Sequence, residues 1–302
     1  MPFLTSMPEL VMNEILKNLD FRQVQTLRKV CHGLQDFIDH RKPDAKFNAV
    51  ELYVRDDYIL VKYKLCDHKY YVEYRTLSPE DSWTTNRRIV HDPNYVNTLL
   101  RDLALILSCQ NSTLNNLSLY QRSNVSNSYS NILEGMASIL TSRRTPLKTK
   151  GLIMDARDQH QMLSIFSRLD SNVLDDIEIR DPVACIHSEK VEMNEVVKSE
   201  QWKKAKNVRV SSIRFPYRLD YFEHFSSLSL YVHELENEHV EEIKQREVEH
   251  RVGLLDGTDG NKVYFRMKNS SDILKIEQLF DTQIRFVRLS ASEAPEGIVV
   301  RD

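Results

Sequence analysis

The residue types that usually carry enzyme chemistry are sparse and poorly spaced in this sequence. The chain has only seven glycines, and none lies in a loop pattern that cradles phosphates or exposes a serine nucleophile. Two short cysteine–histidine pairs, Cys66 with His68 and Cys185 with His187, lack the doubled spacing of a zinc site. The sequence therefore predicts no catalytic residue, no metal site and no cofactor, and it argues against an enzyme.

Two charged patterns have a structural interpretation that outweighs a chemical one. Asp158 and His160 offer an acid and a base together, but an aspartate that precedes a helical pattern ordinarily caps the helix. Basic residues gather at 143–150 and 203–206, and no aromatic set interleaves with them to stack nucleic-acid bases. Since the net charge is also −3, we do not expect a nucleic-acid partner.

Length and composition indicate an ordinary globular protein. The 302 residues, 41% hydrophobic and 28% charged, suffice for one large domain or two smaller ones. We find no apolar run of membrane-spanning length and no signal peptide, so we expect no membrane partner. The four cysteines are far apart and mostly in apolar surroundings, which predicts reduced, mostly buried thiols in the cytoplasm or the nucleus.

Residues 7–39 show the most regular apolar spacing in the chain. The pattern predicts three short helices, each with an apolar stripe. Helices this short cannot enclose so much apolar surface, so the rest of the chain or a partner must cover the remainder. The stripes consist of Leu10, Val11, Ile15, Leu16, Leu19, Val24, Leu27, Val30, Cys31, Leu34, Phe37 and Ile38.

The residues at 7–39 resemble an F-box, and their ending is similar to F-box proteins expanded in nematodes. The sequence departs from the family pattern at Met7, usually Leu, and at Leu34, often Trp, and both changes keep apolar bulk. The resemblance implies that residues 1–44 bind a Skp-family adaptor and, through it, a cullin. It is carried by Met7-Pro8-Glu9, Ile15-Leu16, Leu19-Asp20-Phe21 and Leu27-Arg28-Lys29-Val30-Cys31. The adaptor contacts that it implies are Pro8, Leu10, Ile15, Leu16, Leu19, Leu27, Val30 and Cys31.

Residues 45–92 predict a short antiparallel β-meander that connects the F-box to the rest of the chain. Runs rich in β-branched and aromatic residues lie at 50–54, 58–63 and 70–74, and polar pairs separate them at hairpin distances. A loop should follow at 77–88, with Trp83 as its anchor.

Residues 93–290 predict alternating strands and helices. Helix faces lie at 96–107, 129–140 and 162–169, and a weaker one lies near Trp202, which we interpret as a core residue. Leucine-rich strand motifs of one form begin at Leu114, Leu174, Ala205 and Phe225, with a degenerate copy at Leu152. The predicted class is α+β or α/β, with an irregular leucine-rich-repeat-like β/α solenoid; an open α/β sheet remains the alternative. The continuation should be a helix at 236–251, a strand at 263–267, a helix at 271–280, a strand at 284–289 and a tail at 291–302.

The C-terminal half, at about 140–285, resembles the FTH domain that accompanies the nematode F-box in one large family. The residues that carry the resemblance are Pro146 to Lys150, Leu174 with Ile177 and Ile179, Glu200-Gln201-Trp202-Lys203-Lys204-Ala205-Lys206, and Phe222 with His224 and Phe225. Both resemblances together imply a non-catalytic subunit of a Skp–cullin–F-box ubiquitin ligase, whose repeat domain recognises a target protein for ubiquitin-dependent degradation. The alternative is a non-degradative scaffold that holds a regulatory or RNA-binding protein.

The repeated strand motif also predicts a surface for the target protein. If the strands lie side by side with their leucines in the core, the residues between the leucines form one outward row. That row is mixed in charge, as suits a protein partner. Its members are Ser118, Ile153, Glu178, Arg209 and Ser229.

Overall fold

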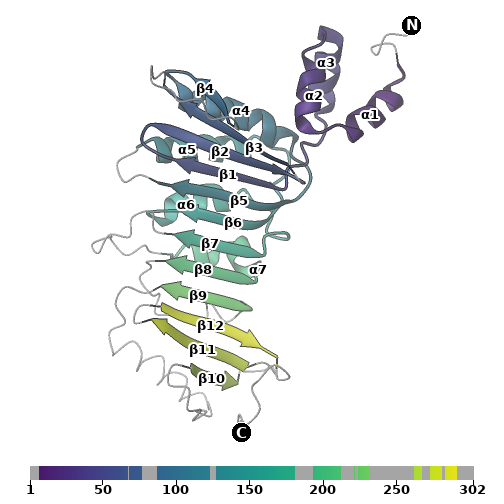
Figure 1. The fold of residues 1–302 in the computed structure, drawn as a ribbon. Helices are drawn as coiled ribbons and strands as arrows, with labels where there is room; N and C mark the ends of the chain where they lie inside the picture. The colour runs from purple at the N-terminus through teal and green to yellow at the C-terminus, as the bar shows by residue number, and fades with distance from the viewer. Residues whose placement is uncertain are drawn as a thin grey trace. The chain divides into compact units, whose positions relative to one another are not determined.

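The chain is a mixed α/β protein with helices at its N-terminus (Figure 1). A computed structural model describes residues 7–66, 68–76, 87–122, 127–180, 193–211, 221, 224–231, 262–266, 273–280 and 283–290. The chain forms two compact units, of which the first comprises Met1–Gly151 with Ser164–Val173 and the second Leu152–Leu163 with Leu174–Asp302. None of the described helices has the length and apolar character needed to cross a membrane.

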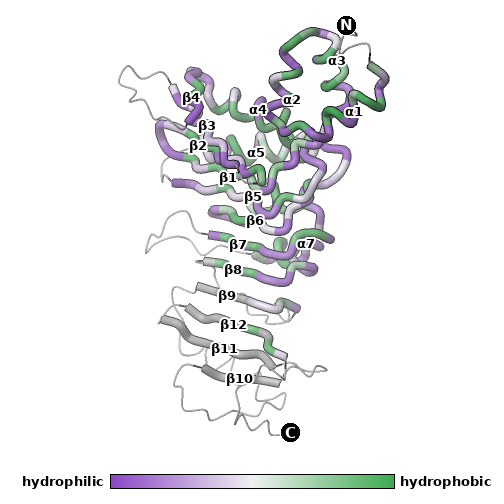
Figure 2. Tube along the Cα trace, turned by 45° about the vertical axis from the view of Figure 1, so that its right-hand side comes forward, coloured by the Kyte–Doolittle hydropathy of each residue, from purple (hydrophilic) through white to green (hydrophobic). Residues whose placement is uncertain are grey.

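The N-terminus forms the three predicted helices, α1 (Glu9–Asn18), α2 (Phe21–Arg28) and α3 (His32–Arg41). A capping box starts α2: Asp20 Oδ1 accepts the Gln23 N–H, and Gln23 Oε1 accepts the Asp20 N–H, both at 2.8 Å. Hydrophobic and hydrophilic segments alternate along these helices (Figure 2). Their own small core contains Leu16, Val24 and Ile38, with Leu19, Leu27 and Phe37 packed against it.

The first unit contains a mixed sheet in the strand order β5-β1-β2-β3-β4. The predicted meander is confirmed, because β1 (Ala49–Val54), β2 (Tyr58–Leu65) and β3 (His68–Arg75) pair antiparallel. β4 (Arg88–His91), which the sequence did not predict, adds in parallel to β3. β1 also pairs in parallel with β5 (Leu114–Gln121), so the meander and the first leucine-motif strand belong to one sheet.

One face of this sheet packs on α4 (Tyr95–Cys109) and α5 (Asn127–Thr141), which lie behind the strands in Figure 1. Leu52 of β1 and its register partner Leu119 of β5 are at most 1% exposed. Burying one such leucine contributes about 1.5–3 kcal/mol. The hydroxyl of the buried Tyr74 donates to Asp102 of α4 at 2.9 Å and so ties the sheet to that helix.

The second unit contains parallel strands with short helices between them. β7 (Asp176–Arg180) pairs in parallel with β8 (Asn207–Ser211), and β8 pairs in parallel with β9 (Ser227–Tyr231). Between β7 and β8 lie a 3₁₀ turn, η2 (Val196–Lys198), and α7 (Glu200–Lys204). The boundary between the two units falls within β6 (Thr149–Asp155) and within α6 (Gln159–Phe166).

The strand direction reverses after β9. β12 (Gln283–Leu289) pairs antiparallel with β9 and with β11 (Ile273–Phe280), and β11 pairs antiparallel with β10 (Lys262–Arg266). The strands predicted at 263–267 and 284–289 are confirmed, whereas the helix predicted at 271–280 is wrong. Apolar spacing in so short a segment fits helix and strand equally, and pairing with two neighbouring strands decides between them. The helix predicted at 236–251, the tail at 291–302 and Trp83 lie outside the described residues.

The prediction of mostly buried cysteines is only partly correct. Cys109 is buried at the end of α4, whereas Cys31 and Cys66 are exposed. Both exposed cysteines lie at the ends of elements: Cys31 precedes α3, and Cys66 occupies the turn between β2 and β3 with φ 42°. Apolar neighbours in the sequence therefore do not bury a side chain at a helix start or a tight turn. Cys185 lies outside the described residues.

Trp202 is a core residue, as predicted. The side chain of Ser199 caps α7 and accepts the Trp202 N–H at 3.3 Å, which turns the indole inward. Trp202 has no exposed surface, and its ring packs edge-on to Phe225 with ring centroids 5.1 Å apart. The indole Nε1–H donates to the Tyr221 carbonyl at 3.1 Å, so the single polar atom of the side chain is satisfied.

Replacing this tryptophan tests its role in the second unit. Trp202→Ala should lower the free energy of unfolding by about 3–5 kcal/mol, because it removes a fully buried aromatic side chain and leaves a cavity. Thermal and denaturant unfolding measure the change. The neighbouring Lys203→Ala is the control, because Lys203 is exposed. A melting temperature that is the same for wild type and Trp202→Ala would contradict the packing described here.

Candidate functional site

The residues predicted to contact an adaptor divide into an exposed and a buried group. Leu10 and Val30 are large apolar side chains with 76% and 68% of their surface exposed. Pro8 and Cys31 are also exposed. Leu16, in contrast, is 3% exposed and lies in the core of the helices. The remaining predicted contacts are half-buried: Ile15, Leu19 and Leu27.

The exposed group gives α1 and the α2–α3 turn an apolar surface. Val11 adds to it with 42% of its surface exposed. Single exposed leucines are common on proteins, but an apolar group on helices that already have a closed core indicates a surface for a partner. The buried Leu16 stabilises the helices and offers no surface to a partner.

A set of hydrogen bonds, which we call the polar seam, joins the three helices to the rest of the first unit. Its members are Asp44, Ala45, Phe47, Cys109, Gln110, Asn111, Ser112 and Arg143. Lys42 ends α3 in the left-handed conformation, φ 45°, and turns the chain towards α4. The Asp44 carboxylate then accepts the backbone N–H groups of Asn111 and Ser112, at 2.9 and 3.1 Å. The N–H of the buried Ala45 donates to the Cys109 carbonyl at 3.0 Å. The seam thus fixes the linker to the end of α4 by both side-chain and backbone bonds.

Gln110 provides the most buried bonds of this seam. Its amide is 1% exposed and pairs with the backbone of Phe47: Oε1 accepts the Phe47 N–H and Nε2 donates to the Phe47 carbonyl, each at 3.0 Å. Nε2 also donates to the Ser112 carbonyl at 2.9 Å. The Phe47 ring lies between Phe21 of α2 and Tyr63 of β2, with ring centroids 5.3 and 5.2 Å away. Gln110 therefore holds the side chain that links helices and sheet.

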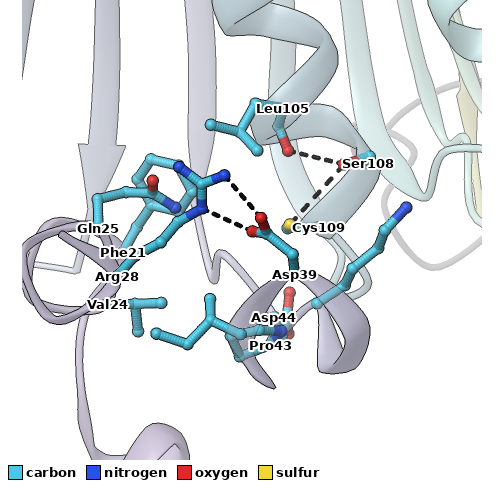
Figure 3. Close-up of a pocket in the computed structure, with 12 residues that line it drawn as sticks. Phe21, Val24, Gln25, Arg28, Asp39, Pro43, Asp44, Leu105, Ser108 and Cys109 are labelled. Atoms are coloured by element: carbon cyan, nitrogen blue, oxygen red, sulfur yellow. Dashed lines mark hydrogen bonds and ion pairs between the residues drawn. The ribbon is translucent and has the colours of Figure 1, made fainter. Parts of the chain in front are cut away.

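A small pocket of about 200 Å³ lies beside the seam, between α2, α3 and the end of α4 (Figure 3). Arg28 donates from Nε and Nη2 to both oxygens of Asp39, at 2.6 and 2.7 Å. This paired hydrogen bond lowers the pKa of Asp39 and raises that of Arg28. Burial raises the pKa of the Cys109 thiol, which keeps it protonated and a poor nucleophile. The pocket thus contains neither an activated nucleophile nor a free acid–base pair.

The other chemical motifs have structural roles. Asp158 caps α6, as expected, because its Oδ1 accepts the Gln161 N–H at 2.8 Å. Arg143 donates to the Gln110 carbonyl at 2.7 Å and belongs to the seam, although the sequence pattern grouped it with solvated basic residues. No group of three or more histidine, cysteine, aspartate or glutamate side chains that could hold a metal occurs among the described residues. His187 lies outside them.

The predicted target-binding row is brought together in part. Glu178, Arg209 and Ser229 are register partners on β7, β8 and β9, and Arg209 lies 3.6 Å from the Glu178 carboxylate. Arg209 has 57% of its side chain exposed, whereas Glu178 and Ile153 are half-buried. Ser118 and Ser229 are 2% and 7% exposed, so these two serines offer little surface to a partner.

A second group of side chains, which the sequence did not predict, lies on the sheet of the first unit. Glu51 binds Lys62, Lys64 and the hydroxyl of Tyr53, each at 2.8 Å. Burial alone would raise the pKa of Glu51, but these hydrogen bonds outweigh it and lower the pKa to about 2. The alternation of apolar and polar residues in β1 could have placed Glu51 and Tyr53 on one face. The sequence held no signal for the Tyr120 of β5 that stacks on Tyr53.

Two models of known protein families match this chain. The family model of the FTH domain matches residues 130–283, about half of the chain. The chain belongs to the FTH-domain family. The F-box model matches residues 4–46, so this F-box–FTH protein carries the two domains in the expected order, and α1–α3 lie within the F-box. No curated protein and no solved structure matches the chain.

The seam of the F-box–FTH protein predicts a large effect of a conservative change. Gln110→Leu keeps the side-chain bulk but leaves the buried N–H and carbonyl of Phe47 without partners. It should lower the free energy of unfolding by about 2–4 kcal/mol, as expected for two buried polar groups that lose their hydrogen bonds. Denaturant unfolding measures this loss.

The control for this change is Gln35→Leu. Gln35 is a half-buried residue of α3 whose side chain has no hydrogen-bond partner within the described part of the chain. Equal stability of Gln110→Leu and Gln35→Leu would show that the amide of Gln110 contributes nothing to the seam.

Proposed function

We propose that this protein is a non-catalytic, substrate-recognition subunit of a Skp–cullin–F-box ubiquitin ligase. Its F-box binds a Skp-family adaptor and, through it, a cullin, while the region at 93–290 binds a target protein. The observation that carries the proposal is the exposure of Leu10 and Val30 on helices whose core is closed without them. Ubiquitin transfer then belongs to other subunits of the complex.

The division between core and surface residues supports adaptor binding. Leu16, Val24 and Ile38 hold the three helices together, and Phe47 attaches them to the sheet. The free protein therefore gains no packing from the exposed apolar residues of α1 and the α2–α3 turn. A partner that covers them removes apolar surface from water, which favours association.

We assign target binding to the β/α region because of the way in which the strands of that region are arranged. The leucine-motif strands β7, β8 and β9 lie parallel and in register, so outward residues of successive strands lie next to each other. We propose that these units behave as an irregular leucine-rich-repeat-like solenoid. Its row at Glu178 and Arg209, with Ile153 and the surroundings of Ser229 in the same unit, then contacts the target.

Exposed F-box residues provide the direct test of adaptor binding. Leu10→Asp and Val30→Asp should each place a charge in a desolvated interface and weaken binding by several kcal/mol. Neither should lower the melting temperature by more than a few degrees, since both side chains are exposed. Co-purification with a Skp-family adaptor and thermal unfolding measure the two effects.

Two further variants distinguish loss of contact from loss of folding. Asn131→Asp introduces the same charge at an exposed residue of α5, outside the F-box helices and the pocket beside them, and should leave adaptor binding intact. Leu16→Asp should unfold the helices, because Leu16 is in their core. Unchanged adaptor binding by both Leu10→Asp and Val30→Asp would contradict the proposal that the F-box binds a Skp-family adaptor.

Exchanging a charged pair tests the target-binding row. The double variant Glu178→Arg with Arg209→Glu keeps opposite charges at a pair that is 3.6 Å apart in wild type. It loses the 2.7 Å ion pair between Glu178 and Arg180, which is partly exposed and contributes little to stability, so the variant should still fold. It reverses the charge pattern presented to a target, so capture of ubiquitinated partners should fall while adaptor binding stays intact. Quantitative mass spectrometry of co-purified proteins compares the double variant with wild type. The same captured set at the same yield would exclude this row as the contact.

A further inference from the structure

The sheet of the first unit carries a connected set of side chains on the face opposite α4 and α5. We call this set the tyrosine–arginine cluster; it comprises Glu51, Tyr53, Lys62, Lys64, Tyr120 and Arg122. In register, Glu51 pairs with Lys62, and Tyr53 pairs with Tyr120. The intervening Leu52 is fully buried. It shares its face of the sheet with Val54, whose neighbours across the strands are Ile59 and the Tyr74 that contacts α4. Since side chains alternate along a strand, the cluster lies on the other face.

Hydrogen bonds fix the position of the first tyrosine. The Tyr53 hydroxyl donates to Glu51 Oε2 at 2.8 Å, and Lys62 and Lys64 hold the same carboxylate at 2.8 Å each. The Tyr53 ring stacks on that of Tyr120, with ring centroids 4.8 Å apart and planes inclined by 26°. The two rings are thus ordered before any partner arrives, which reduces the entropy lost on binding.

Arg122 lies over this aromatic pair. Its guanidinium carbon is 5.0 Å from the centre of the Tyr120 ring and 5.9 Å from that of Tyr53. Arg122 is exposed, and no carboxylate pairs with it in the described part of the chain. A guanidinium stacked on aromatic rings still presents its N–H edge, and that edge matches the two oxygens of a carboxylate.

The charges of the cluster identify the kind of partner. Lys62, Lys64 and Arg122 stand against the single carboxylate of Glu51, so the cluster is positive although the whole chain carries −3. Both lysines are already bound to Glu51, which leaves one guanidinium free for a new ion pair. A nucleic-acid backbone or a phosphate generally needs several free cations, whereas a carboxylate side chain needs only this one.

We propose that the tyrosine–arginine cluster binds an acidic segment of the target protein, with an aspartate or glutamate of that segment paired to Arg122. The proposal rests on the proposed function in one respect, namely that the bound protein is a target of the ligase. The cluster is otherwise independent of the F-box surface, so adaptor binding does not require it.

A direct binding measurement on the full-length protein tests this site. The probe is a fluorescently labelled oligo-glutamate peptide, and its anisotropy should show binding that weakens with added salt. Arg122→Gln should reduce the affinity about tenfold or more, as expected for the loss of a charged, bidentate hydrogen bond. Arg122→Lys should recover only part of it, because lysine keeps the charge without the planar fork. Tyr53→Phe should also weaken binding, since it removes the hydroxyl that anchors the ring to Glu51.

Matched controls decide the outcome. Arg144→Gln removes another exposed arginine of the same unit and should bind the peptide like wild type. Equal affinity of wild type and Arg122→Gln, equal losses in Arg122→Gln and Arg144→Gln, or no binding of the peptide at all would each overturn the proposal. Tighter binding of a labelled oligo-dT strand, lost in Arg122→Gln, would also overturn it and identify a nucleic-acid site.

The same samples separate this proposal from the ligase function. If wild type binds the peptide but no Skp-family adaptor, the acidic-segment site is supported and the ligase role is rejected. Wild type that binds the adaptor but not the peptide would retain the ligase role and reject the site. The melting curve of Arg122→Gln should match that of wild type, and Arg122→Lys takes its place in the comparison if it fails to fold. Tyr53→Phe should unfold cooperatively at a slightly lower temperature, because it loses one hydrogen bond to Glu51.

Discussion

The buried amide of Gln110 is the interaction on which the arrangement of the first unit depends. The linker after α3 must leave the helices and enter β1, and a buried chain segment needs partners for its N–H and carbonyl groups. The side chain of Gln110 supplies both partners to Phe47, while Asp44 accepts the N–H groups of Asn111 and Ser112, which follow α4. An apolar residue at 110 could fill the same space but could not satisfy this backbone. Hydrogen bonds from polar side chains therefore fix the linker that carries the F-box helices. With its backbone fixed in this way, Phe47 can pack its ring between Phe21 and Tyr63.

The same separation of roles explains why the F-box surface is free to bind. Because Phe47 and the seam hold the helices, the side chains of Leu10 and Val30 are not needed for attachment and remain exposed. In the sheet, the face on α4 and α5 is mostly apolar and carries the Tyr74–Asp102 hydrogen bond, and the opposite face carries charged and aromatic side chains such as Glu51 and Tyr53. Each surface that we propose for binding thus lies on an element that is stabilised by packing on its other side.

Local sequence patterns predicted the helices and strands better than they predicted which of them pack or pair with one another. Apolar spacing identified α1–α3 and the strands β1–β3, because each has one buried face. It could not tell that Leu16 is core and Leu10 surface, since both lie on apolar positions of one short helix. Residues 271–280 form a strand because β10 and β12 flank them. The seam could not be predicted because Phe47 and Gln110 are 63 positions apart in the sequence. The sequence did not predict contacts between distant segments. In those contacts the role of a side chain depends on a residue far away in the sequence, which local spacing does not reveal.

The reversal of strand direction after β9 has a consequence for how such a protein can change in length. A parallel neighbour requires a crossover long enough to return the chain to the same end of the sheet, whereas an antiparallel neighbour requires only a turn. Duplicating one strand-and-helix segment ahead of β9 would preserve every existing pairing direction. The same duplication directly after β9 would preserve them too, because the new strand would be parallel to β9 and antiparallel to β12. A strand added by a turn alone must instead alternate in direction, as β12, β11 and β10 do. Growth by whole strand-and-helix segments therefore belongs to the parallel part of the second unit, and growth by hairpins belongs to its antiparallel part.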